Sequence, residues 1–293
     1  MRTRILYVNL TYYCDNDCTF CFSHTTGCGS RRIAEEDFLH ALHEFHPCDR
    51  DVIVINGGEP SLHPGFVRIV NHILSSTDSF LKVYTNGRHL SEFEIARSPR
   101  LTYVIPIHGD RILHDNVTRV QGSYDETVDS VATIQENGQP YALKFIVTPE
   151  LVDSGFNINR FLKGNRFSPC EIFIARLNET IKSKRNWCRR LDRERLERFV
   201  SESIVQCRQR RIKLLDIPPC AISDFAADGQ LLENPPEFYF CDDKTKVGLR
   251  IYKKQVKIFG PCDSCPWSAM CETMSRTYLT LVCCRGNWSL EAE

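Results

Sequence analysis

The chain has 293 residues with 37 basic and 37 acidic side chains, so its formal net charge is zero. This balance argues against the broad positive field of a protein that binds nucleic acid or an anionic membrane. Hydrophobic residues make up 42 % of the chain, which is enough for a sizeable core and excludes global disorder.

Cysteine is unusually frequent, and its count of 15 is odd. The N-terminus is not a signal peptide, because its apolar run is broken at Asn9 and leads into a cysteine cluster. No apolar stretch reaches the roughly 18–20 residues that span a bilayer. We therefore expect a cytoplasmic protein in a reducing compartment, where clustered cysteines more often bind metal or do chemistry than form disulfides.

Apolar runs rich in Val, Ile, Tyr and Phe alternate with amphipathic stretches over the first two-thirds of the chain. Strands are predicted at residues 5–10, 52–55, 81–84, 103–107, 141–147 and 171–175. Helices are predicted at residues 34–45, 64–75, 91–97, 124–137, 157–163 and 191–210. This alternation predicts an α/β fold with a parallel sheet, open or rolled into a barrel, whose chemistry lies at the carboxyl ends of the strands.

The composition changes near residue 211, where proline, glycine, asparagine and aspartate become frequent. Five of the cysteines lie between Cys220 and Cys271. We predict a core over residues 1–210 and a small, loop-rich C-terminal module over residues 211–293. The sequence contains no internal repeat.

Three cysteines, Cys14, Cys18 and Cys21, follow the first predicted strand in CxxxCxxC spacing. One loop with three thiolates can wrap a compact iron–sulfur cubane and ligate three of its four irons, which leaves the fourth open. A zinc site with His24 as the fourth ligand is the alternative.

This motif resembles the signature of the radical S-adenosylmethionine superfamily, in which an aromatic residue, here Phe20, precedes the last cysteine. Gly57, Gly58 and Glu59 end the second predicted strand and resemble the GGEP motif of the same superfamily. The resemblance implies a partial (β/α)6 barrel, a 4Fe–4S cluster and S-adenosylmethionine, with Phe20 near the adenine and Glu59 near the methionine amino group. A tight turn between strand and helix is the structural alternative for the two glycines.

Three further residues follow predicted strands at places where the family carries ligand contacts. Asn86 ends the third strand, His108 ends the fourth, and Arg176 follows the sixth. By resemblance, they reach the ribose or the carboxylate of S-adenosylmethionine. A satisfied loop histidine and a surface arginine are the alternatives for His108 and Arg176. The stretch 114–124 resembles a family loop, and Ser123 is expected to cap the next helix with Glu126 three residues on.

The C-terminal cysteines Cys262, Cys265 and Cys271 resemble the auxiliary-cluster segment of SPASM or Twitch extensions. The fourth ligand is expected to be Cys220, or alternatively Cys241. Ser275 stands where the full SPASM pattern has a further cysteine, so one auxiliary 4Fe–4S cluster is expected. A structural zinc knuckle is the alternative.

The remaining cysteines give no comparable pattern. Cys283 and Cys284 are ambiguous, and buried apolar positions are expected for Cys28, Cys48, Cys170, Cys188 and Cys207. The basic stretch 182–198 contains three acidic residues. This mixture favours a solvent-exposed start of a helix over a contact with nucleic acid.

The resemblance implies reductive cleavage of S-adenosylmethionine to a 5′-deoxyadenosyl radical that abstracts hydrogen from a substrate. A one-electron donor such as flavodoxin or ferredoxin is the implied partner. A ribosomally synthesised peptide is the first substrate hypothesis, and a sugar, aminoglycoside or nucleotide oxidised by a small-molecule dehydrogenase is the alternative. The early first strand, at about residue 5, argues against a fused peptide-recognition domain. A non-catalytic zinc-binding interaction protein is the third hypothesis.

Overall fold

The structure, a computed structural model, describes residues 4–21, 31–177, 191, 193–215, 217, 237–241 and 250–252. Within these residues the strands form one sheet in the order β7-β6-β5-β4-β3-β2-β1-β8-β9. Neighbouring strands are parallel except for β8 and β9, which are antiparallel. The strands are β1 (Arg4–Thr11), β2 (Val52–Gly57), β3 (Phe80–Tyr84), β4 (Leu101–Ile107), β5 (Tyr141–Val147), β6 (Glu171–Arg176), β7 (Ile212–Leu215), β8 (Glu237–Cys241) and β9 (Arg250–Tyr252).

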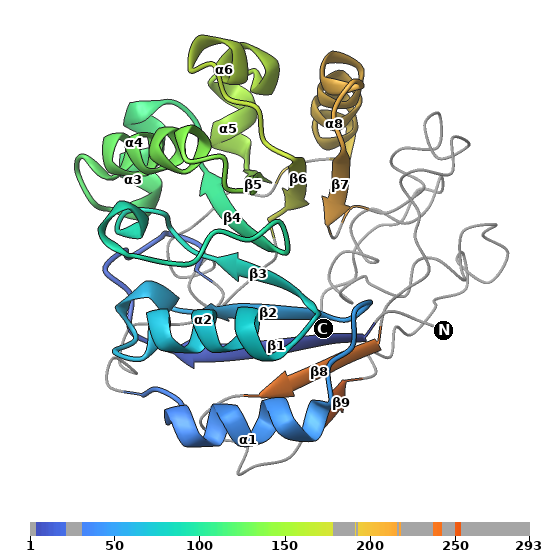
Figure 1. Cartoon of the computed structure of the whole chain (residues 1–293). Coiled ribbons are helices and arrows are strands. Elements are labelled where there is room, and N and C mark those ends of the chain that lie inside the picture. The colour runs from blue at the N-terminus through green and yellow to red at the C-terminus, as the bar shows by residue number, and fades with distance from the viewer. Residues whose placement is uncertain are drawn as a thin grey trace, which may run out of the picture.

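Helices connect the strands and lie along the outer side of the curved sheet (Figure 1). They are α1 (Glu35–Phe45), α2 (Phe66–Ser76), α3 (Arg111–Thr118), α4 (Ser123–Glu136), α5 (Pro149–Asp153), α6 (Ile158–Gly164) and α8 (Arg193–Cys207), with short 3-10 turns at Pro60–Leu62 and Leu90–Glu92. The strands β1 to β7 form a parallel half-barrel, which confirms the predicted α/β class. Each of the six predicted strands lies within an observed one.

Alternate residues of each strand face the two sides of the sheet. On β4, Ile105 and Ile107 belong to the main core between sheet and helices, whereas Val104 belongs to a smaller cluster on the concave side. Ala142 of β5 and Phe173 of β6 complete this concave cluster. Both faces of the central strands therefore carry buried apolar residues, and the helices cover the outer face.

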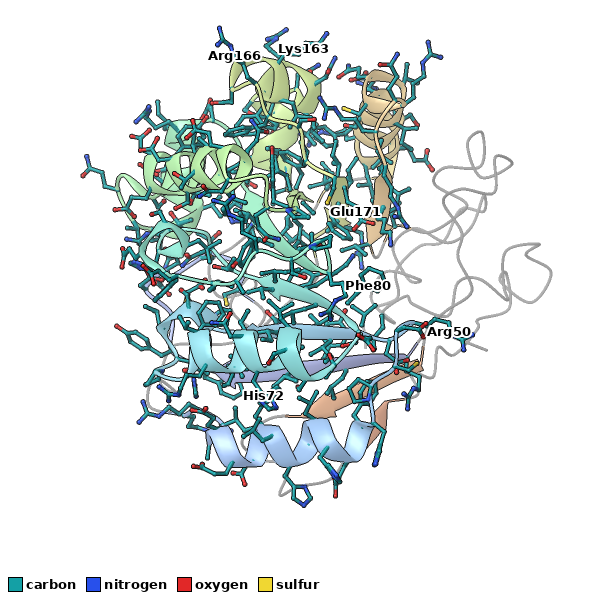
Figure 2. The ribbon with its side chains drawn as sticks, viewed as in Figure 1. Arg50, His72, Phe80, Lys163, Arg166 and Glu171 are labelled. Atoms are coloured by element: carbon teal, nitrogen blue, oxygen red, sulfur yellow. The ribbon has the colours of Figure 1, made fainter. Side chains whose placement is uncertain are left out.

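Charged side chains occupy the amino-terminal end of the concave face. Glu171, labelled in Figure 2, is the first residue of β6. Its carboxylate lies 2.8 Å from Lys82 Nζ on β3, 3.2 Å from Arg211 and 3.4 Å from Lys213. Burial raises the pKa of Glu171, but the bond from Lys82 and the three cations outweigh it, so the pKa is lowered. This network closes the end of the half-barrel opposite to the candidate site.

One predicted helix, at residues 91–97, is wrong. The chain makes a single 3-10 turn over Leu90–Glu92 and then continues without regular structure. Phe93 and Ile95 both pack against the main core. Their spacing of two residues places them on the same side of an extended chain, not of a helix.

The stretch expected to be a loop between residues 114 and 124 contains most of α3. Asp110 caps this helix, because its carboxylate accepts the N–H of Leu113 at 3.0 Å. Ser123 is not the N-cap of α4, since α4 begins at Ser123 itself and the side chain makes no capping bond. Instead, the Asp115 carboxylate accepts the N–H groups of Gly122 and Tyr124 at 2.7 and 2.9 Å.

The later part of the chain also contributes to the sheet. β7 extends it beyond β6, and β8 lies parallel to β1, with Cys241 opposite Val8. The division at residue 210 stays a prediction. Cys207 is buried as expected, whereas Cys48 and Cys170 are exposed, so that expectation is wrong for both. Over the described residues, no helix is long and apolar enough to cross a membrane.

Candidate functional site

The cysteine loop, residues 12–21, begins where β1 ends at the carboxyl edge of the sheet. Within the described part of the chain, Cys14, Cys18 and Cys21 form no disulfide, and each is partly exposed. The loop is tightly wound, because Cys21 N–H donates to the carbonyl of Cys18 at 3.2 Å and Asn16 N–H donates to Cys14 Sγ at 3.4 Å. Burial raises the pKa of the Cys14 thiol, and the nearby charges of Glu59 and Cys18 raise it further.

The two glycines that end β2 lie directly against the start of the cysteine loop. Gly58 N–H donates to the Thr11 carbonyl at 2.6 Å, and Glu59 N–H donates to the Tyr13 carbonyl at 2.8 Å. A Cβ on Gly58 would lie 2.1 Å from the Tyr13 oxygen, and Gly57 has a positive φ of 147°. The glycines therefore have a structural reason that the sequence did not reveal, namely the close approach of two backbones beside Cys14.

Glu59 is fully buried. Its carboxylate accepts hydrogen bonds from the residues that directly follow the neighbouring strand, β3. One oxygen accepts Thr85 Oγ1 at 2.7 Å and Ser61 N–H at 3.1 Å, and the other accepts Asn86 N–H at 2.6 Å. Burial raises the pKa of Glu59 even though these bonds favour the ionised form. A carboxylate has about four acceptor positions, so one position on Oε2 remains for a ligand donor.

The loop after β3 binds the cysteine loop mainly through the Asp15 carboxylate, and Arg88 adds bonds to Asn16 Oδ1 and to the Asp15 carbonyl. Asp15 accepts hydrogen bonds from Asn86 Nδ2, Arg88 Nη1 and His89 Nε2, each at 2.7 Å. Burial lowers the pKa of His89, but its bonds to Asp15 and Glu92 outweigh this, so the pKa is raised. The side chain of Asn86, expected at the ligand, therefore has a structural role here.

The other side of the cysteine loop rests on the end of α3. Asp17 N–H donates to the Thr118 carbonyl, and Thr19 N–H donates to the Val117 carbonyl, both at 2.9 Å. These carbonyls belong to the last turn of the helix, where a carbonyl has no N–H partner within the helix itself. Arg119 adds an exposed ion pair with Asp17 at 3.1 Å. The loop is thus bonded on both sides before any ligand binds.

A buried aromatic group lies beside the loop at the end of β4. The Phe20 ring contacts the His108 ring edge-on, with centroids 5.4 Å apart, and His108 also contacts His114 at 5.1 Å. Burial lowers the pKa of His108, and burial lowers that of His114 to about 4, so both rings are neutral at pH 7. Within the described residues, the buried Nδ1 of His108 has no hydrogen-bond partner. An unpaired polar atom at this place suits a bound ligand.

Two lysines lie on the concave face, and one of them, Lys82, belongs to the Glu171 network. Lys144 Nζ lies over the Tyr84 ring at 5.4 Å, and Lys82 Nζ lies over the Phe173 ring at 5.1 Å. The charge of Lys144 also contributes to the lowered pKa of His108. The face below the loop therefore combines aromatic rings with positive charge, which suits a polar substrate.

The remaining predicted site residues are not brought to the cysteine loop by the described structure. Arg176 is the last residue of β6 and lies on the same face of that strand as Ile172 and Ile174, which pack against the helices. Its contact with the ligand therefore stays a prediction. Cys241 lies in β8. The other residues of the predicted auxiliary and zinc sites lie outside the described residues, as does most of the basic stretch; they are His24, Cys220, Cys262, Cys265, Cys271, Ser275, Cys283 and Cys284.

The cysteine loop fits an iron–sulfur cluster better than a single metal ion. Across the described parts of the chain, no three His, Cys, Asp or Glu side chains are grouped so as to hold one ion. A cluster requires less convergence, because each thiolate ligates a different iron. Three cysteines on one anchored loop, with the unpaired Nδ1 of His108 nearby, are consistent with a cluster and a second polar ligand.

Several site residues escaped the sequence analysis, above all Asp15, Arg88, His89 and Thr85. Their signals were present, since Asp15 and Asp17 alternate between the first two cysteines and Arg88 and His89 follow shortly after Asn86. Nothing in the sequence shows that residues 15 and 88 are in contact. Only the parallel pairing of β1 with β2 and β2 with β3 brings the two loops to one edge.

Comparison with known proteins gives consistent results. Residues 8–154 match the model of the Radical SAM superfamily. The sporulation killing factor maturation protein SkfB of Bacillus subtilis is 22 % identical over 149 residues, covering 50 % of this chain and 36 % of SkfB. The AdoMet-dependent heme synthase of Methanosarcina barkeri is 24 % identical over 153 residues, covering 50 % of this chain and 43 % of the synthase. The matches thus cover less than half of these curated relatives.

Solved structures resemble the fold over more of the chain. Streptococcus suis SuiB bound to S-adenosylmethionine aligns with a TM-score of 0.65 and 15 % identity, covering 95 % of this chain and 74 % of SuiB. Native anSMEcpe with bound AdoMet aligns with a TM-score of 0.64 and 14 % identity, covering 92 % of this chain and 88 % of anSMEcpe. At these identities the likeness shows the fold alone. Since the family match covers half of the sequence and includes the cysteine loop, the chain belongs to the Radical SAM superfamily.

Proposed function

We propose that the protein is a radical S-adenosylmethionine enzyme whose 4Fe–4S cluster is held by Cys14, Cys18 and Cys21. The observation that carries the proposal is the cysteine loop itself. It presents three cysteines at the carboxyl edge of a half-barrel and is bonded by the end of β2, the loop after β3 and the end of α3. Because these bonds already fix the loop, less conformational entropy would be lost when the loop binds a cluster.

The chain's own residues would bind and orient S-adenosylmethionine. Phe20 would pack against the adenine, and His108 Nδ1 would bond the ribose or the carboxylate. Gly57, Gly58 and the free acceptor position of Glu59 would face the methionine amino group, with Asn86 and Arg176 as further contacts. When bound, the cluster and S-adenosylmethionine would supply reductive radical chemistry, namely a 5′-deoxyadenosyl radical able to abstract hydrogen from a substrate.

We infer that the substrate is a ribosomally synthesised peptide. Similarity supports this: SkfB is a maturation protein, SuiB has been crystallised with the precursor peptide SuiA, and anSMEcpe with the Cp18Cys peptide. The alternative is a small molecule, such as a sugar, aminoglycoside or nucleotide, processed by oxidoreductase-type radical chemistry. The similarity to an AdoMet-dependent heme synthase favours a small molecule of some kind.

We further propose an auxiliary cluster in the C-terminal part, with Cys262, Cys265 and Cys271 and a fourth ligand from Cys220 or Cys241. Its support is the cysteine spacing and the likeness to SuiB and anSMEcpe folds. A reduced flavodoxin or ferredoxin would deliver the electrons, and a cytoplasmic location would suit the 15 cysteines.

The proposal is tested by anaerobic reconstitution with iron and sulfide, followed by incubation with S-adenosylmethionine and dithionite. We expect 5′-deoxyadenosine to form slowly without substrate and faster with the correct one. Peptides encoded beside the gene and a panel of sugars, aminoglycosides and nucleotides are then compared for acceleration. A reconstituted protein that contains iron but forms no 5′-deoxyadenosine under any condition would contradict the proposal.

A further inference from the structure

Arg88 connects three parts of the site through one guanidinium group. Its Nη1 lies 2.7 Å from Asp15 Oδ2, 2.9 Å from Asn16 Oδ1 and 3.3 Å from the backbone carbonyl of Asp15. Its Nε donates to the carboxylate of Glu126 on α4. Arg88 thus bonds the two residues that immediately follow Cys14 and ties them to a helix of the half-barrel.

The bonds of Arg88 differ from an ordinary surface ion pair. Its side chain is only 12 % exposed and that of Asp15 only 19 %. Exposed ion pairs contribute little because water screens them, whereas shielded charge-assisted bonds fix geometry and are costly to remove. The guanidinium of arginine presents its Nε and Nη1 donors in one rigid plane, here to Glu126 and to the cysteine loop, whereas the ammonium group of lysine is a compact charge without that planar geometry. The backbone N–H of Arg88 adds a bond to Asn86 Oδ1 at 3.0 Å, which fixes its own position.

The charge of Arg88 also acts on the place where the cluster would bind. Its guanidinium bonds the backbone carbonyl of Asp15, the residue that follows Cys14. Reduction adds one negative charge to an iron–sulfur cluster, so a nearby cation favours the reduced form. Without Arg88, the carboxylates of Asp15 and Glu126 would remain beside the cluster with less compensation.

We propose that Arg88 is a positioning residue that holds the first half of the cysteine loop for cluster binding, and that its positive charge raises the reduction potential of that cluster. This inference rests on the proposed function of the loop. It attributes two separate effects to one side chain: the planar guanidinium group positions the loop, and the positive charge raises the reduction potential.

The test compares reconstituted wild type with the variants R88K, R88M and R88M/D15N. Iron and sulfide content measure loading, redox titration followed by EPR measures the potential, and thermal unfolding of the apo-protein controls for folding. R88M is expected to load less cluster. It should also shift the reduction potential to more negative values, where about 59 mV corresponds to a tenfold change in the one-electron equilibrium. R88K should keep the wild-type potential but load less cluster, because only the charge is preserved. R88M/D15N, which removes one charge of each sign, should load poorly at a near-wild-type potential.

R68M serves as the matched control, because Arg68 makes an exposed ion pair with Glu35 that joins α1 to α2. It should leave both loading and potential unchanged. The inference is overturned if R88M loads cluster like wild type, or if its potential is unchanged or more positive. If R88M does not fold, wild-type loading by R88K alone overturns the positioning role. Failure of the proposed function is distinguishable, because wild type itself would then bind no cluster.

Discussion

The close approach of Gly58 to the cysteine loop gives the sharpest test of how the site is built. In Gly58→Ala, the new Cβ would lie 2.1 Å from the Tyr13 oxygen, 2.6 Å from its carbonyl carbon and 2.9 Å from the Tyr12 carbonyl carbon. Ordinary contact begins at 3.4 Å, so the Tyr13 carbonyl has to move by about 1.3 Å. That residue directly precedes Cys14, so the movement displaces the first thiol of the loop.

The cost of this movement can be worked from the bonds that it breaks. Glu59 N–H donates to the Tyr13 oxygen at 2.8 Å, and Gly58 N–H donates to Thr11 at 2.6 Å. Two lost hydrogen bonds cost about 2 kcal/mol, and residual strain adds roughly 1–3 kcal/mol. We expect the melting temperature of the apo-protein to fall by about 6–10 °C. Iron bound after anaerobic reconstitution should fall to less than about half of the wild-type amount.

Gly164→Ala is the control for this experiment. Gly164 is the last residue of α6 and does not have a positive φ, and a Cβ added to it would meet no heavy atom of another residue within 4 Å beyond its own helix and chain neighbours. Alanine is the better helix former, so this variant should match wild type or be slightly more stable. Full iron loading by Gly58→Ala, with a melting temperature equal to that of the control, would refute the steric reasoning.

Three further predictions concern the residues that support the site. Burial lowers the pKa of His114 to about 4 against an unfolded value near 6.5, so protonation favours the unfolded chain and stability is lost as the pH falls through this window. Between pH 7 and pH 5, the free energy of unfolding measured with urea should fall by about 2 kcal/mol. If His114→Gln had the same pH dependence as wild type, this role of His114 would be contradicted. Glu171→Gln leaves Lys82 and its neighbouring cations without a carboxylate and should cost about 2–3 kcal/mol in the same assay; a cost below about 0.5 kcal/mol would count against the network. Asp115→Ala should destabilise the protein by about 1–2 kcal/mol and speed amide exchange at Gly122 and Tyr124, because it removes the cap of α4; protected amides in the variant would contradict this role.

The strands were predictable because their signal is local. In residues 141–147 the helix-facing side is buried throughout, and the opposite side has a buried Ala142 and half-buried Lys144 and Ile146. The mostly apolar composition marks such a run without reference to the rest of the chain. The helix α3 was missed because eight residues give little periodicity, and only His108 and Gly109 separate its cap, Asp110, from β4. The helix expected at residues 91–97 does not form, because Phe93 and Ile95 both reach the core from a segment without regular structure.

Only those parts of the site that lie within one short stretch of sequence could be predicted. The spacing of Cys14, Cys18 and Cys21 is visible in the sequence, and so is the pair of glycines after β2. The contact of Asp15 with Arg88 joins residues 73 positions apart, and no local pattern contains it. Likewise, the unpaired Nδ1 of His108 becomes apparent only when the packing of Phe20 and His114 is known.

The central claim is that the loop of Cys14, Cys18 and Cys21 binds an iron–sulfur cluster with one iron open to S-adenosylmethionine. Its most direct test is the EPR spectrum of the reduced, anaerobically reconstituted protein, recorded with and without S-adenosylmethionine, beside the variant C14A/C18A/C21A. We predict a cluster signal that S-adenosylmethionine changes in wild type and that is absent at this site in the variant. Stoichiometric zinc without iron at the loop, or a signal that the triple variant retains in full, would contradict the account.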